Sequence, residues 1–164
     1  MKLPAAIVAV AAAFPGAGLA QHVVNEPTLS TDAALEAARA ALAKCRADGQ
    51  KVTVVVVDHA GRQKVVLRDD GAAPHTAEHA FRKAYTALTY KMTSADYGKR
   101  AGEAKGIAIG PQLLPNITTA AGAVPIKVGS ATVGAIGVSG TPGSSGGGEH
   151  DATCAAAGAD KVKG

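Results

Sequence analysis

The segment "KVTVVVVD" at residues 51–58 constrains the fold most, because it is an almost unbroken run of β-branched side chains. Such a run favours a buried strand. The following "DHAG" at 58–61 is typical of a tight turn, and "RQKVVLR" at 62–68 has the pattern of a returning strand. The sequence therefore predicts a β-hairpin whose first strand is buried.

Helical patterns precede and follow this hairpin. Residues 29–49 carry apolar side chains at helical spacing, with Ser30 or Thr31 as the N-terminal cap and Gly49 at the end. Further helices are expected over 76–92, 93–106 and about 149–162, and strands over 117–128 and 131–140. The order α-β-β-α-α-β-β-α, with short turns between paired strands, predicts an α+β fold with helices packed on an antiparallel sheet.

The first 20 residues have the layout of a secretory signal peptide, with Lys2, an apolar run and small residues before a cleavage point after Ala20. We expect a flexible segment over 21–28 and a single domain over 29–164, located in the periplasm or secreted. An uncleaved anchor is the alternative. No other apolar run approaches the length of a membrane span, so no membrane insertion is expected after cleavage.

Charge and composition argue against nucleic-acid binding. The chain has 17 Lys and Arg residues against 13 Asp and Glu, its cations are scattered, and aromatic residues make up 3%. A nucleic-acid surface needs a basic face and usually stacking rings.

The glycine-rich stretch before the last helix does not fit a nucleotide-binding loop. It lacks the Gly-Lys-Ser/Thr of a phosphate loop, and Glu149 and Asp151 lie in the first turn of the helix that follows. These carboxylates complement the helix dipole and would repel a phosphate. A flexible connection into the helix is the better interpretation.

Two cysteines, Cys45 and Cys154, lie near the two ends of the domain. An even count in an exported chain favours one disulfide between them. Two unpaired buried thiols are the alternative.

The sequence identifies no catalytic group. Ser139 is not in a G-x-S-x-G elbow, and His59 on the hairpin turn is expected to be exposed. His75 and His79 are four residues apart, a spacing that holds a metal if the helix reaches back to His75; exposure on the helix surface is the alternative. A non-enzymatic role is favoured.

Taken together, several segments resemble the GlcG/HbpS family of haem-binding proteins over residues 28–162. The matching segments are "LSTDAALEAARAALAKC", "VTVVVVDHAGRQKVVLRDDGA", "PHTAEHAFRKAYTA", "GAVPIKV", "VGAIGVSG" and "EHDATCAAAG". The resemblance implies a three-layer sandwich with helices on both faces of an antiparallel sheet. It also implies a homo-oligomer, often an octamer, and for some members a two-component sensor kinase as partner.

The resemblance also implies haem as a cofactor and suggests residues for its site. His75 or His79 would supply the axial donor, with Tyr85 as an alternative, and Arg82 and Lys83 would meet the propionates. The pocket lining would come from the segments "GAVPIKV" and "VGAIGVSG", at Gly122, Pro125, Gly137, Ser139 and Gly140. The expected function is haem sensing, storage or scavenging. The alternative is binding of an organic acid or aldehyde, or an accessory role in a glycolate- or diol-type pathway.

Overall fold

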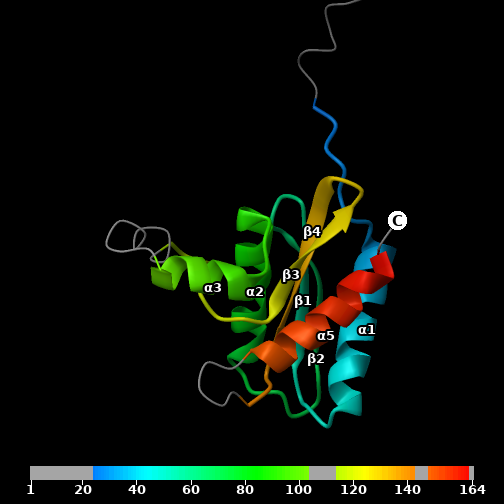
Figure 1. Ribbon diagram of the computed structural model, residues 1–164. Helices are drawn as coiled ribbons and strands as arrows, with labels where there is room; N and C mark the ends of the chain where they lie inside the picture. The colour runs from blue at the N-terminus through cyan, green and yellow to red at the C-terminus, as the bar shows by residue number, and fades with distance from the viewer. Residues whose placement is uncertain (1–23, 104–113, 143–147, 163–164) are drawn as a thin grey trace, which may run out of the picture.

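A computed structural model describes residues 24–103, 114–142 and 148–162 (Figure 1). The signal peptide expected over 1–20 lies outside the described residues. The elements are α1 (Thr31–Ala47), β1 (Thr53–Asp58), β2 (Gln63–Arg68), α2 (Thr76–Tyr90), α3 (Ser94–Glu103), β3 (Ala123–Val128), β4 (Ala131–Ser139) and α5 (Glu149–Ala159), followed by a short 3-10 turn at Asp160–Val162. This order and the helix starts near Ser30, His75 and Gly148 agree with the sequence pattern.

The four strands form one antiparallel sheet in the order β2-β1-β4-β3. Helices α1 and α5 cover one face and α2 covers the other (Figure 1). In β1, Val54 and Val56 face the core under α1 and α5, whereas Val55 and Val57 face α2. All six residues of β1 are buried, which is why the strand is apolar without alternation. The expected three-layer sandwich is confirmed.

Small residues allow α1 and α5 to pack closely on the sheet. The buried face of α1 is built from Ala34, Ala37, Ala38 and Ala41. A side chain at Gly158 of α5 would place its Cβ 2.6 Å from the Ala37 carbonyl oxygen and 2.6 Å from Ile136. Close packing of the two helices therefore depends on alanine and glycine at these positions.

A disulfide joins the same two helices. Cys45 on α1 and Cys154 on α5 are bonded, with their Cα atoms 5.6 Å apart and both residues fully buried. The expected bridge is confirmed, and the alternative of free thiols is excluded for these two residues.

The strand expected over 117–128 is shorter than the sequence suggested, because β3 begins at Ala123. The backbone N–H of Thr118 donates to Thr86 Oγ1 at 3.0 Å, and that of Ala123 donates to Ser94 Oγ at 3.0 Å. Side chains of α2 and α3 thus take donors that a longer strand would give to the sheet. Within the described ranges, no helix has the length and hydropathy to cross a membrane.

Candidate functional site

The residues expected to bind haem are divided between two cavities. His75, His79 and Lys83 line a cavity of about 350 Å³ between α2, the end of β4 and the start of α5, which we call the polar pocket. Tyr85 lines a second cavity of about 490 Å³ beside the β1–β2 turn, which we call the hairpin cavity. Arg82 is exposed on α2 and forms an ion pair with Glu78 at 2.8 Å.

The polar pocket is built on the first turns of α2. His75 is the N-cap residue with a helical backbone, and the N–H of His79 donates to its carbonyl oxygen at 3.0 Å. The helical spacing therefore does extend back to His75, and both imidazoles line the pocket. His75 is exposed, whereas His79 is half-buried and its Nδ1 lies 3.2 Å from Ser139 Oγ.

The surroundings of His79 favour the neutral form of its imidazole. Burial lowers the pKa of His79, and the positive charges of Lys83, His75 and Arg82 lower it further against the opposing effect of Asp151. A neutral imidazole can accept a proton or ligate a metal.

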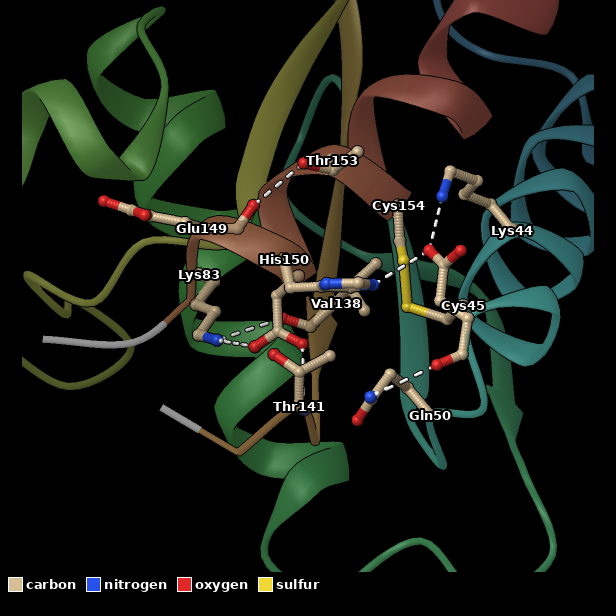
Figure 2. The surroundings of a disulfide bond; sticks show 12 residues. Lys44, Cys45, Gln50, Lys83, Val138, Thr141, Glu149, His150, Thr153 and Cys154 are labelled. Carbon is tan, nitrogen blue, oxygen red and sulfur yellow. Dashed lines mark hydrogen bonds and ion pairs between the residues drawn. A yellow bond between two sulfur atoms is a disulfide. The ribbon is translucent and has the colours of Figure 1, made fainter. Parts of the chain in front are cut away.

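Lys83 lies at the base of the polar pocket in a buried ion pair (Figure 2). Its Nζ donates to Asp151 Oδ2 at 2.8 Å and to the Val138 carbonyl oxygen at 3.1 Å, while Asp151 Oδ1 accepts the N–H of Thr141 at 3.1 Å. Lys83 is 1% exposed and Asp151 is 2% exposed. Burial lowers the pKa of Lys83, and Asp151 opposes that shift. Because its charge is already matched, Lys83 is poorly suited to a propionate.

The expected lining residues have different positions. Ser139 and Gly140 line the polar pocket. Gly122 instead makes room for the ion pair, since a Cβ there would lie 2.8 Å from Lys83 Nζ. Gly137 lies beneath α2, and Pro125 pairs with Ala135 in the sheet.

The hairpin cavity is more apolar. Its apolar walls come from Pro27, the turn at Ala60, Tyr85 and Leu88 of α2, and Ala131 at the start of β4, and the rest of the lining is mostly polar: Glu26, His59, Thr89, Lys91 and Thr132. Gly61 has φ +77°, and a Cβ at this residue would lie 2.8 Å from the Tyr85 ring. A glycine in the turn is therefore required for the hairpin to contact α2.

His59 supplies the hairpin cavity with an imidazole that the sequence did not identify. Its side chain is 30% exposed, and its Nε2 lies 3.3 Å from Glu26 Oε2. Its Nδ1 is buried and has no hydrogen-bond partner among the described residues. The expectation of a simply exposed turn residue missed this, because no local pattern places Glu26 and Tyr85 around residue 59.

The two cavities suit different ligands. Haem needs an apolar slot, usually an axial donor, and cations near its propionates. The hairpin cavity offers apolar walls, His59 and Lys91. The polar pocket is smaller and mostly lined by hydroxyl, imidazole and charged groups, so a small polar ligand fits it better.

Comparison with known proteins identifies the family. Residues 29–160 match the family described as "Haem degrading protein HbpS-like". A double mutant of HbpS from Streptomyces reticuli is 36% identical, with a TM-score of 0.79, over 91% of this chain and 97% of that one.

More distant structures share the fold. The Klebsiella pneumoniae protein ORFY is 24% identical with a TM-score of 0.78, over 88% of this chain and 97% of that one. A structure described as a PduOC:Heme complex is 23% identical with a TM-score of 0.72, over 82% of this chain and 95% of that one. Among curated proteins, none matched. The family match over most of the domain and the 36% identity to HbpS place this chain in the HbpS-like family.

Proposed function

We propose that this protein binds haem in the hairpin cavity, with His59 as the axial donor. The observation that carries the proposal is a cavity of about 490 Å³ with apolar walls and one half-buried imidazole. The haem-related description of the family and the haem complex of a structural relative support the same ligand.

The residues of the cavity have complementary roles in this proposal. Glu26 lies beside Nε2 of the imidazole, and carboxylates commonly orient metal-ligating histidines. Because Nδ1 is buried, ligation by this nitrogen requires the ring to turn toward the cavity. The ring of Tyr85 and the side chain of Leu88 contact the macrocycle, and Lys91 pairs with a propionate. The phenol of Tyr85 is the second axial donor that this cavity offers.

Hemin titration of the purified protein tests the proposal. We expect a sharpened Soret band that saturates at a fixed stoichiometry, and we expect His59→Ala to shift or abolish it. His79→Ala and His75→Ala are matched controls, because both histidines line the other cavity. Loss of the band in His79→Ala with an unchanged His59→Ala would move the haem to the polar pocket. A featureless free-hemin spectrum for the wild type would refute haem binding.

We propose further that the protein is exported and acts as a homo-oligomer in haem sensing, storage or scavenging. The signal-like first 20 residues and the disulfide support export to an oxidising compartment. Cell fractionation and light scattering after size-exclusion chromatography test the location and the octamer. Co-purification with a two-component sensor kinase tests sensing, and loss of the Soret band over time with reductant and oxygen would indicate haem degradation instead.

The polar pocket favours a second candidate function, binding of a small organic acid or aldehyde. The pocket brings together the His79–Ser139 contact and the Lys83–Asp151 pair within about 350 Å³. Thermal shift measurements with glycolate and small aldehydes test it. Stabilisation that is lost in Ser139→Ala and His79→Ala but kept in His59→Ala is expected, and no stabilisation by any of them argues against it.

A further inference from the structure

Potential metal ligands converge at the junction of α1 and α5, on the opposite face of the sheet from α2. One donor atom each from Asp48, His150 and Cys154 lies within 4.8 Å of the others. His150 and Cys154 are four residues apart on α5, so they share one face of that helix. Figure 2 shows the His150 side chain extending past the disulfide toward the end of α1 that carries Lys44 and Cys45.

The contacts around Asp48 fix its position. This residue is the C-cap of α1, three residues after Cys45, and its Oδ2 lies 2.9 Å from His150 Nε2. Lys44, one turn earlier on α1, forms an ion pair with the same oxygen. The side chains of His150 and Asp48 are 43% and 26% exposed, whereas both cysteines are fully buried. Of these four residues, only His150 and Asp48 meet solvent, so a cation would have to enter from their side.

We propose that reduction of the Cys45–Cys154 disulfide creates a site for Zn²⁺ or a similar divalent cation, with Cys45, Cys154, His150 and Asp48 as ligands. Two thiolates, one imidazole and one carboxylate make four donors of the types that Zn²⁺ takes in tetrahedral sites. The bonded sulfurs of a disulfide are poor ligands, because the thiolate is the form of cysteine that binds a metal. The intact disulfide and the metal site therefore exclude each other.

The chemistry requires a two-electron reductant, which a cellular dithiol can supply. A dithiol transfers two electrons and two protons to the disulfide by thiol–disulfide exchange and becomes a disulfide itself. Binding of Zn²⁺ then releases the two thiol protons and leaves two metal-bound thiolates. The charge of the two thiolates and the Asp48 carboxylate is offset by the cation and by the nearby Lys44.

The surrounding packing keeps the ligands in place after reduction. The cysteine Cα atoms are 5.6 Å apart, and the contacts of Gly158 with Ala37 and Ala41 hold the two helices together independently of the sulfur bond. Short movements of the side chains then suffice to reach Zn–S distances of about 2.3 Å.

Titration with Co²⁺ as a spectroscopic probe tests the proposal. Protein reduced with a phosphine should develop thiolate-to-cobalt charge-transfer absorption that Zn²⁺ displaces, and oxidised protein should not. His150→Ala and Asp48→Asn should each weaken Co²⁺ binding by at least about tenfold, since even loss of a group outside the ligand set commonly costs that much. The matched control Glu149→Gln, which changes an exposed carboxylate in the first turn of α5, should leave binding unchanged.

Several outcomes would overturn the site. These are equal Co²⁺ binding by oxidised and reduced protein, charge-transfer bands that persist in Cys45→Ser, or no effect of His150→Ala. If reduction unfolds the chain, circular dichroism can measure whether Zn²⁺ refolds it. Zn²⁺ should then restore the folded spectrum in the wild type and not in His150→Ala, and failure to do so would also contradict the proposal.

Discussion

At the scale of single residues, the Lys83–Asp151 pair is the most consequential interaction. Two buried charges offset each other's loss of hydration, so removing one of them leaves the other uncompensated. We expect Lys83→Met to lower the free energy of unfolding by about 3–5 kcal/mol, measured by urea denaturation. The double variant Lys83→Met/Asp151→Leu should recover part of this loss. A single variant as stable as the wild type would show that the pair contributes little.

His79 should make stability depend on pH. Its pKa is lowered in the folded protein, mainly by burial, so below its ordinary value of about 6.5 the unfolded chain binds a proton more readily. The contribution of His79 to the free energy of unfolding is therefore fully present above about pH 6.5. It is lost as the pH falls from there toward the lower pKa of the folded state.

Replacing His79 tests this sign. We expect His79→Gln to flatten the fall in unfolding free energy between about pH 7 and pH 5 in the haem-free protein. His75→Gln removes one of the positive charges that lower the pKa of His79, so it should reduce the slope less than His79→Gln does. An unchanged slope in His79→Gln would assign the pH dependence to other groups.

At the scale of elements, close contact between α2 and β4 depends on Gly137. A Cβ at this position would overlap the Ala80 carbonyl oxygen and lie 2.8 Å from the Ala84 nitrogen. We expect Gly137→Val to cost about 1–3 kcal/mol or more by overpacking, seen as a lower melting temperature. Gly102→Ala in α3 is the control, because no atom of the described residues lies within 4 Å of its Cβ position, and it should be neutral or stabilising. Equal melting temperatures for Gly137→Val and the wild type would contradict this packing.

Most elements were predictable because their signals are local. The run of β-branched residues predicted β1. Ser30 caps α1 by accepting the N–H of Ala33, and Asp58 accepts the N–H groups of Ala60 and Arg62 in the turn. The error at 117–122 arose where the signal was not local. The hydrogen bonds from Thr118 to Thr86 and from Ala123 to Ser94 join residues 32 and 29 positions apart, and no periodicity reveals them.

The candidate site was only partly predictable for the same reason. Helical spacing correctly placed His75 and His79 on one side of α2, where both line the polar pocket with Lys83. It gave no sign that Asp151 neutralises Lys83, because these residues are 68 positions apart and approach only when α5 packs on the sheet. His59 was missed because its partners come from the N-terminal segment and from α2.

At the scale of the whole molecule, α5 connects the two faces of the sheet. Its Asp151 reaches Lys83 on α2, and one turn later Cys154 is bonded to α1. A change at the disulfide can therefore act on the polar pocket through a single helix. The hairpin cavity has no lining residue from α5 and should respond less.

The disulfide should dominate the stability of the whole domain. It joins residues 109 positions apart, and a loop of about 100 residues corresponds to about 4–5 kcal/mol in the chain-entropy model, within the measured range for native bridges of about 2–5 kcal/mol. We expect Cys45→Ala/Cys154→Ala to lower the unfolding free energy by roughly that amount in urea. Reductant should destabilise the wild type to a similar extent and leave the double variant unchanged, since the variant has no bond to lose. If reductant destabilises both proteins equally, the effect does not arise from this bridge. The buffer must contain no divalent metal, because Zn²⁺ bound to the reduced protein would restore part of the lost stability.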